Sequence, residues 1–480
     1  RSRALTLAAY FAERFASRRV QVAAGVTINL GLGGYLLAVT QGAAYLLTQV
    51  MPVNYHQALV ISWVTYTGFT LYAGTRGVVI TDTVMFLLFT FVAFFALLFL
   101  VGEAGGLQSA VDGLARLPEK RGLMSWTGIV GDDAPFQSGL HFALWNVTLA
   151  LAWGLVYAVS PWQSSRYLVA RNEHVAIRAA CIAAVSLAFL EITLYLGGAV
   201  VNLWDSTIDP PHQVMIFAAR ELLPPVLGAG LLAGIMAAAL SSASTFLSLV
   251  GFSVSNDLFP HRTGDEAQLL RWSRWTMLGV GLVALAIAVP APVDLFWLTY
   301  FVGTLFASSW GPVAIMSVWS RRITADAAFW GIISGFVFNA GPKGLVTLGW
   351  LTLPYWLDPV LLGALVSLAV VLVMSRLGAP SRAEQIYRLR MHRTPPEERD
   401  AGQVRRTRRM PFLLVIYALG LASLFAIAYL PPYRAATGEP ARAEAILLAI
   451  GPILWTLTAF VAWWVIGRSY GLKPRARTSS

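Results

Sequence analysis

The chain has 480 residues, of which 57% are hydrophobic and only 12% are charged, whereas about 25% are charged in an average soluble domain. This composition excludes an ordinary soluble domain, a disordered chain and a disulfide scaffold, and it is typical of a polytopic α-helical membrane protein. The single cysteine, Cys181, also excludes internal disulfides and any multi-cysteine metal site. In a membrane protein, the net charge of +11 raises the question of which side of the membrane holds the arginines.

Twelve apolar stretches are predicted to span the membrane, because a spanning helix needs about 20 mostly apolar residues. The first two lie in one uncharged run from Val20 to Thr75, which Pro52 and Asn54 divide. In chain order, the predicted spans are about 20–49, 56–75, 83–102, 140–161, 179–204, 226–251, 275–290, 295–319, 327–346, 358–375, 411–431 and 443–467.

The connections between these spans divide the basic residues unequally. One side of the membrane, which includes residues 1–19 and the C-terminal tail, carries 28 of the 35 Lys and Arg residues. The positive-inside rule therefore predicts that residues 1–19 and the C-terminal tail are cytoplasmic. On the opposite side, the long connection 103–138 is predicted to hold a short surface helix around residues 107–117.

The most basic connection is 376–410, which carries ten arginines, including Arg405, Arg406, Arg408 and Arg409. It is predicted to be a cytoplasmic loop. The arginine run can be interpreted as part of a solvated loop that obeys the positive-inside rule. The alternative is a site that binds anionic lipid head groups.

The sixth predicted span is rich in hydroxyl groups. Four of them share one helical face, at spacings i, i+3, i+4 and i+7: Ser241, Ser244, Thr245 and Ser248. Ser242 lies about 100° round the helix from Ser241, and the carbonyl of Ala238 is about one turn before both serines. Such neutral oxygens suit a small hard cation. The alternative is packing through small residues whose hydroxyls bond to carbonyls one turn back.

The fourth predicted span ends in an unusual polar and aromatic stretch. Its notable residues are Trp153, Tyr157, Ser160, Pro161 and Trp162. A proline beside Ser and Gly predicts a break in the helix, and broken helices expose backbone groups to substrate in transporters. The alternative is a helix that ends at the interface, with Trp162 and Tyr167 as anchors. Arg166 is predicted to be a positive-inside anchor rather than a ligand.

Two acidic residues stand out. Glu191 is the only acid in the interior of a predicted span, so it is expected to face a cavity or to be protonated. It could relay protons, bind a cationic substrate or simply bond to a neighbouring helix. Asp82 begins the third span, where it is predicted to cap the helix N-terminus.

The sequence contains no recognisable catalytic motif. The six histidines are scattered, without the HExxH pattern, and neither a G-x-S-x-G elbow nor a P-loop occurs. An enzyme is therefore not predicted.

Five segments share their order and spacing with the motifs of one known family. They are Leu5–Phe15 (similar to TLxEFxxxRF), Tyr72–Asp82 (Y-GG-x-x-AV-x-x-TD), Ser160–Arg171 (QPHxxxRxxAxK), Leu222–Leu258 (LPP…AAxMSTxxS…DLY) and Trp319–Ala327 (YWKRxTxxGA). Over about residues 5–340, the chain thus resembles the sodium:solute symporters, which include proline, pantothenate and sodium/glucose transporters.

The resemblance implies a five-plus-five inverted repeat, in which the sixth span here is the eighth core helix. It implies a coupling sodium ion at Ala238, Ser241 and Ser242. It also implies an ion path near Asp82, with Ser244 and Thr245 beside it. The fourth span would be the broken sixth core helix, and the substrate would be lined by Trp153, Tyr157, Ser160, Pro161 and Trp162.

The chain also departs from the family pattern. Ser160 and Trp162 replace a more usual Gln and His, so the substrate cannot be carried over. Glu191 has no counterpart in the pattern. Family members have three further helices before the first motif, so the chain is expected to be an N-terminally truncated form.

These observations predict one transmembrane transporter domain over residues 1–480, with core helices in 20–346, the basic loop 376–410 and accessory helices in 411–467. The predicted function is sodium-coupled symport of a small organic solute across the inner membrane by alternating access. Sodium would be the co-transported ion, without an organic cofactor; the partners would be solute and membrane lipid, without nucleic acid. The alternatives are a proton-coupled transporter that uses Glu191 and a transporter-like solute sensor.

Overall fold

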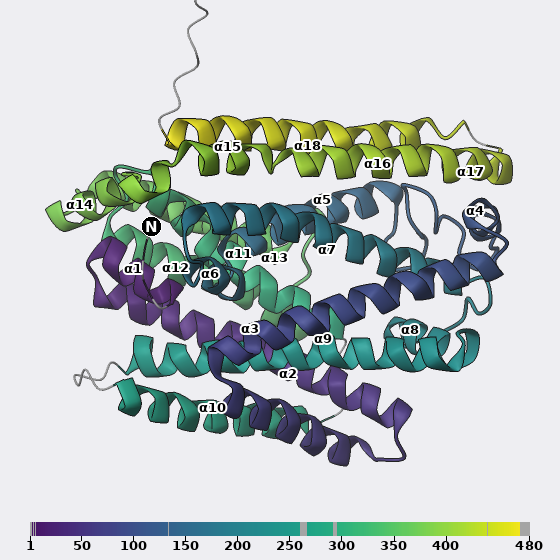
Figure 1. Ribbon diagram of the computed structural model, residues 1–480, viewed down its shortest axis with the longest axis horizontal. Helices are drawn as coiled ribbons and strands as arrows, with labels where there is room; N and C mark the ends of the chain where they lie inside the picture. Colours follow the sequence, from purple (N-terminus) through teal and green to yellow (C-terminus); the bar gives the residue numbers. More distant parts are fainter. Residues whose placement is uncertain are drawn as a thin grey trace, which may run out of the picture. The chain divides into compact units, whose positions relative to one another are not determined.

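The computed structural model describes residues 2, 4, 6–132, 134–259, 266–290, 295–438 and 440–470, with the backbone alone at 73–76, 266 and 269. Within these residues, one isolated bridge joins Val130 and Phe136, and all other regular structure is helical. The predicted all-α membrane fold class is thus confirmed. The contacts divide the chain into two compact units, each built from three separate segments and described here by itself (Figure 1).

The first unit consists of residues 1–89, 144–169 and 233–391. Its helices are α1 (Leu7–Phe15), α2 (Arg18–Val50), most of α3 (Tyr55–Glu103), most of α5 (Gly139–Val159), α6 (Pro161–Leu168), most of α9 (Pro225–Ser253) with η3 (Val254–Leu258), α10 (Glu266–Ala288), α11 (Leu295–Trp319), α12 (Ala325–Thr347), α13 (Pro359–Leu377) and α14 (Arg382–Met391).

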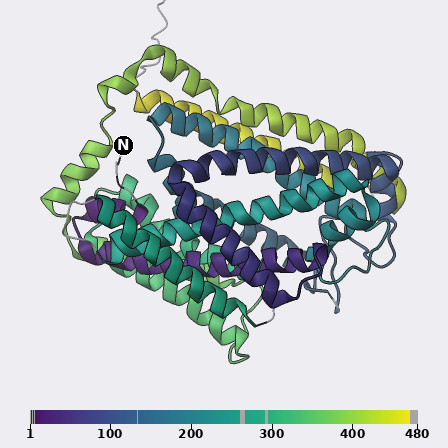
Figure 2. The same ribbon diagram turned by 60° about the horizontal axis from the view of Figure 1, so that its bottom comes forward.

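The second unit consists of residues 90–143, 170–232 and 392–480. Besides the remaining parts of α3, α5 and α9, its helices are α4 (Leu107–Ala115), α7 (Glu173–Val201), η1 (Pro211–Gln213), α8 (Val214–Phe217), η2 (Ala218–Leu222), η4 (Pro396–Arg399), α15 (Ala401–Arg409), α16 (Phe412–Ala428), α17 (Leu430–Thr437) and α18 (Arg442–Ser469). Helix α4 confirms the surface helix predicted around 107–117. Figures 1 and 2 agree that α16 and α18 run side by side.

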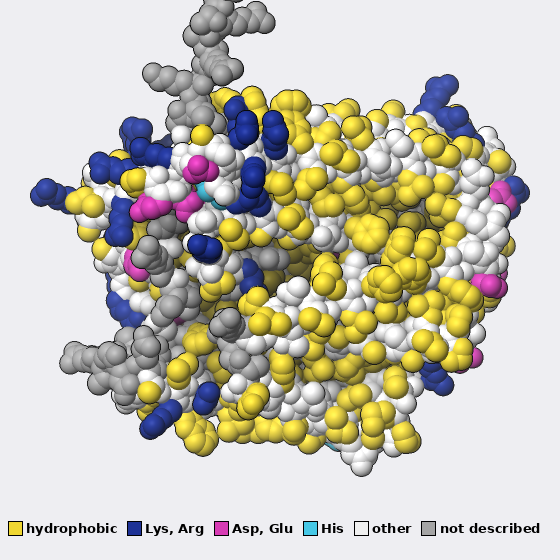
Figure 3. All heavy atoms as spheres, in the orientation of Figure 1, with side chains coloured by type: hydrophobic (Ala, Val, Ile, Leu, Met, Phe, Trp, Pro, Cys, Tyr) yellow, Lys and Arg dark blue, Asp and Glu magenta, His cyan; other side chains and the backbone are white. Residues whose placement is uncertain are grey.

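Nine segments of the described residues are long and apolar enough to cross a membrane, compared with twelve predicted spans. The other three predicted spans, 56–75, 275–290 and 327–346, lie in α3, α10 and α12, so they are helical but do not stand among the nine. On the face drawn in Figure 3, hydrophobic side chains cover much of the surface. An integral membrane protein accounts for this surface, because lipid is as apolar as these side chains.

Helix α3 differs from the prediction, because it contains both the second and the third predicted spans without a loop. Its 49 residues would extend about 74 Å at 1.5 Å per residue, more than twice the hydrocarbon thickness of about 30 Å. Its ribbon turns sharply along its length (Figures 1 and 2). Asp82 therefore lies inside a helix, and the predicted N-terminal cap is wrong. No proline between 72 and 82 stops the helix there.

The core of the first unit forms where α2 packs against α11. Gly31 permits this close approach, because a Cβ atom placed on it would lie only 2.4 Å from the ring of Phe306. Phe306 and Trp310 are fully buried there, together with Leu32 of α2. Small residues at a helix contact bring the backbones together and maximise dispersion contacts.

A buried carboxylate joins α1 and α2 to the end of α9. The Oδ1 atom of Asp257 accepts hydrogen bonds from Thr6 (2.9 Å), from Gln21 (3.0 Å) and from Asn256 (2.8 Å). Asp257 is fully buried. Its Oδ2 atom has no hydrogen-bond partner among the described residues. One oxygen of the carboxylate thus accepts the hydrogen bonds of three polar side chains.

Replacing Asp257 with Ala is expected to lower the free energy of unfolding by about 3 kcal/mol, because each buried donor left unpaired costs about 1–3 kcal/mol. Asp257→Asn keeps the accepting oxygen and should be nearly neutral. Thermal unfolding of the purified variants in detergent measures both. An alanine variant as stable as the parent chain would refute the assigned role.

Candidate functional site

The break predicted in the fourth span is confirmed. Helix α5 ends at Val159 and α6 begins at Pro161, and Ser160 between them has extended backbone torsions, with ψ of 145°. Proline suits the first position of a helix, because that N–H would have no partner there in any case. The N–H groups of Trp162 and Gln163 come before the first bond of α6, which runs from the Ser164 N–H to the Ser160 carbonyl (3.0 Å), so they have no partner within the helix. The interruption therefore presents backbone donors inside an apolar span.

An aromatic cluster surrounds this break. The ring of Trp162 packs edge-on against Tyr35 of α2 (5.1 Å between centroids), Phe246 of α9 (5.9 Å) and Phe306 of α11 (5.7 Å). Four helices thus meet at one indole ring.

Trp153 joins the cluster through Gly303 of α11. A Cβ atom on this glycine would lie 2.6 Å from the Tyr35 hydroxyl and 3.6 Å from the Trp153 ring. Tyr157 packs on Trp153 (5.8 Å) and is partly exposed. The predicted substrate-lining residues of α5 and α6 are thus linked by contacts around the break.

Two hydroxyl groups in this region are buried without a hydrogen-bond partner among the described residues. One is Ser160 Oγ, whose side chain was predicted to line the substrate, and the other is the hydroxyl of Tyr35. Buried polar groups usually have partners, so an unpaired one is available to a ligand. Tyr35 was missed from the sequence, because it looks like an ordinary aromatic residue in an apolar span.

The second group of predicted residues gathers round Asp82. Ser241 Oγ donates to Asp82 Oδ1 (2.7 Å), and Thr245 Oγ1 donates to Asp82 Oδ2 at a longer 3.4 Å. An Arg166 amino group lies 2.5 Å from Asp82 Oδ2 and also donates to Thr245 Oγ1 (3.0 Å). The side chains of Asp82 and Arg166 are 18% and 34% exposed, so the ion pair is partly withdrawn from solvent.

Arg166 was the unexpected member of this group. The sequence favoured an interfacial anchor for it, but its guanidinium pairs with Asp82, 84 residues earlier in the chain. Its position near the end of a span gave no signal for such a partner. The ion pair joins α6 to α3, and its hydroxyl partners belong to α9.

The hydroxyl face of α9 divides into two halves. Ser244 and Ser248 bond to carbonyls of their own helix, the oxygens of Ser241 and Ser244, as the packing alternative predicted. Ser241 and Thr245 bond instead to Asp82. Ser242 and Ala238 are half-buried. Of the six α9 and α3 residues predicted for the ion and its path, Ser241 and Thr245 thus donate to Asp82, whereas Ser244 bonds within α9.

Glu191 lies on α7 in the second unit. It is close enough to Tyr195 on the same helix and to Tyr417 on α16 for electrostatic interaction with both phenols. The hydrogen bonds described above for Asp82 come from Arg166, Ser241 and Thr245. A proton-relay function for Glu191 stays a prediction.

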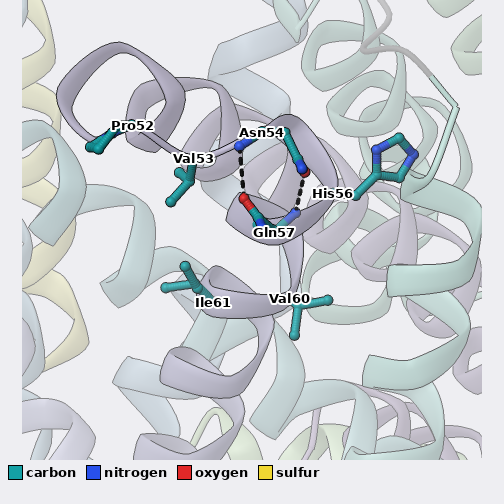
Figure 4. Close-up of a pocket in the computed structure, with 7 residues that line it drawn as sticks. All are labelled: Pro52, Val53, Asn54, His56, Gln57, Val60 and Ile61. Carbon is teal, nitrogen blue, oxygen red and sulfur yellow. Dashed lines mark hydrogen bonds between the residues drawn. The ribbon is translucent and has the colours of Figure 1, made fainter.

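A shallow, open hollow lies where α2 passes into α3 (Figure 4). Its seven lining residues all lie between Pro52 and Ile61. Its amides are used locally, since Asn54 and Gln57 each accept a hydrogen bond from the other's backbone N–H. This is a capping box that begins α3. Because a single segment forms the hollow, no polar groups from different helices converge there.

Comparison with known proteins gives consistent matches. The model of the sodium:solute symporter family matches residues 1–335. The sodium/proline symporter of Escherichia coli is 27% identical over 403 residues, which cover 80% of this chain and 75% of the relative. The sodium/pantothenate symporter of Escherichia coli is 24% identical over 383 residues, 79% of this chain and 76% of the relative.

Among solved structures, a Na⁺-coupled sialic acid symporter in its substrate-bound outward-open state has a TM-score of 0.63 at 16% identity, covering 79% of this chain and 78% of that one. This likeness shows the fold. The family match extends over more than half of the chain, so the chain belongs to the sodium:solute symporter family. The resemblance seen in the motifs is confirmed, and the relatives are membrane transporters rather than enzymes.

Proposed function

We propose that this protein is a sodium-coupled symporter of the cytoplasmic membrane, which moves a small organic solute by alternating access. The observation that carries the proposal is the ion pair of Asp82 and Arg166, which lies within candidate spans together with two hydroxyls of α9. Charged groups are costly inside a membrane and mark ion or substrate pathways. The names of the sodium/proline and sodium/pantothenate relatives support sodium as the coupling ion.

Sodium would bind at the carbonyl of Ala238 and the hydroxyls of Ser241 and Ser242. Hard cations prefer such oxygen ligands. A serine hydroxyl has one proton and two lone pairs, so Ser241 can donate to Asp82 and still offer a lone pair to sodium. Asp82 would then receive the ion on its way out. Ser244 and Thr245, next along α9, would line this path.

Arg166 gives Asp82 an alternative partner to the sodium ion. Without sodium, its guanidinium neutralises Asp82. A sodium ion that reaches the carboxylate competes with this guanidinium, so the two cations exchange rather than add. Because of this exchange, the Asp82 carboxylate faces a cation both with and without sodium, and an uncompensated charge inside the membrane is avoided.

The solute would bind beside the break, against Trp153, Tyr157, Ser160, Pro161 and Trp162. The unpaired hydroxyls of Ser160 and Tyr35 would orient it, and the aromatic rings would supply the apolar walls that small-molecule sites usually have. Sodium and solute would favour the same conformation. Their binding is then coupled reciprocally, and the sodium gradient drives the solute.

Thermal unfolding of the purified protein in sodium and in potassium, at equal ionic strength, tests the ion site without knowledge of the solute. Sodium at a hundredfold excess over Kd should stabilise by ~2.7 kcal/mol, which is roughly 3 °C for a chain of this length. The double variant Ser241→Ala/Ser242→Ala should lose this difference.

Two control variants should keep the stabilisation by sodium. Ser248→Ala removes a hydroxyl that bonds only within α9, so it should keep the sodium effect. Glu191→Gln should keep it as well. Equal melting temperatures in both salts would contradict sodium coupling, and a pH effect on stability that Glu191→Gln removes would favour the proton-coupled alternative.

A further inference from the structure

Helix α15 in the second unit has two sharply different faces. Val404 and Thr407 are buried, and Arg408 is half-buried. Arg405, Arg406 and Arg409 are exposed. At 100° per residue, the three exposed arginines occupy an arc of about 100°, opposite the buried residues. We call these three residues the arginine face.

The opposite face fixes the helix in place. Val404 packs with Ile466 and Tyr470 at the end of α18, and Thr407 bonds to the ring of His174 on α7 (2.9 Å). The Arg408 guanidinium stacks on Trp463, 3.6 Å from the ring centre. Arg408 thus serves as an internal clamp, and α15 presents its other arginines in a fixed orientation.

The arginine face has no counter-charge of its own. Among the described residues, none of its three guanidinium groups forms an ion pair. Arg468 at the end of α18 adds a fourth exposed cation, which lies 4.2 Å above the ring of the half-exposed Trp464. In Figure 3, dark-blue side chains gather at the α15 end of these helices, and hydrophobic side chains follow along α16 and α18.

The position of α15 in the chain indicates that the arginine face lies at the membrane surface. Only Met410 and Pro411 separate Arg409 from α16, and α15 to α17 together form one of the nine candidate spans. The arginines therefore lie where the helix enters the membrane. The exposed Trp464 has the amphipathic ring typical of the head-group level.

We propose that the arginine face is a binding site for the phosphate groups of anionic phospholipids. Guanidinium groups bind phosphate with two parallel hydrogen bonds, and a juxtamembrane basic residue contributes about 1 kcal/mol near an anionic surface. The predicted cytoplasmic position of this segment agrees, because anionic lipid attracts basic segments on that side. Its residues are not among those of the ion and solute sites proposed above.

Native mass spectrometry of the purified protein, titrated with phosphatidylglycerol or phosphatidylcholine, tests the proposal. The protein should bind phosphatidylglycerol more tightly, and the preference should weaken as salt is raised. The variant Arg405→Gln/Arg406→Gln/Arg409→Gln should lose about 100-fold in affinity for phosphatidylglycerol, which corresponds to about 1 kcal/mol per arginine. Phosphatidylcholine binding should not change.

A matched control separates a site from a general charge effect. Arg121→Gln/Arg434→Gln/Arg442→Gln removes the same net charge from exposed positions elsewhere in the second unit, and it should bind phosphatidylglycerol like the parent chain. Equal losses in both triple variants, or equal binding of both lipids by the parent chain, would overturn the proposal. Displacement of the lipid by millimolar inorganic phosphate would indicate a site for soluble phosphate instead.

Discussion

Asp82→Asn is expected to weaken sodium binding by about 100-fold and to abolish sodium-driven transport. Asp82 accepts the hydrogen bond of Ser241, a proposed sodium ligand, and so orients its lone pairs toward the ion. Hydrogen bonds to a charged group contribute about 1.5–3 kcal/mol, and each 1.4 kcal/mol is a factor of ten in affinity. The substitution keeps the shape of the side chain but removes the one acid in the network of Ser241, Thr245 and Arg166. Binding of radioactive sodium to the purified protein measures the change without a known solute.

Asp326→Asn is the matched control for this experiment. Asp326 also pairs with an arginine, Arg19, at 3.7 Å, but both side chains are about two-thirds exposed. Exposed pairs contribute little, so sodium binding should stay as in the parent chain. Unchanged sodium affinity in Asp82→Asn would remove Asp82 from the ion path.

Arg166→Gln should have the opposite effect on affinity, with sodium bound roughly tenfold more tightly. The substitution removes the cation that competes for Asp82, and the loss of a partly exposed charged partner corresponds to about 1 kcal/mol. Transport should nevertheless slow, because nothing then helps to displace the ion from the carboxylate. Equilibrium sodium binding and sodium-driven exchange in proteoliposomes separate the two effects.

The double variant Asp82→Asn/Arg166→Gln tests whether Arg166 acts through Asp82. In this background, removal of the guanidinium should no longer raise sodium affinity, which gives a large coupling energy between the two positions. Arg166→Lys keeps the charge and should remain close to the parent chain in affinity. If Arg166→Gln alone weakened sodium binding, the guanidinium would be a support for the site rather than a competitor.

Most of the helical architecture could be predicted from the sequence, because hydrophobic stretches of about 20 residues are an unambiguous signal. The break at Ser160 and Pro161 could also be predicted, since proline restricts the backbone locally. The continuity of α3 could not be predicted from the sequence. The segment around Asp82 is short and polar enough to read as a connection, whereas in the structure α3 continues through it and Asp82 contacts α9 and α6 from within the helix.

The site could be predicted in part, and the division follows from the range of the interactions. The hydroxyl face of α9 is a local pattern, so Ser241 and Thr245 could be identified from spacing alone. The sequence could not show which of these hydroxyls bond outside their own helix, because that depends on Asp82, 159 residues before Ser241. Arg166 has the sequence context of any arginine near the end of a span. Its partner is visible only in three dimensions.

The contact between Gly31 and Phe306 affects more than stability. Phe306 also packs on Trp162, which stands next to the break proposed to receive the solute. A methyl group added to Gly31 would press on Phe306 and, through it, on the indole. Residues of this kind shape what a binding site accepts although they never meet the ligand, so selection for a new solute could act on the buried face of α2 as readily as on the site itself.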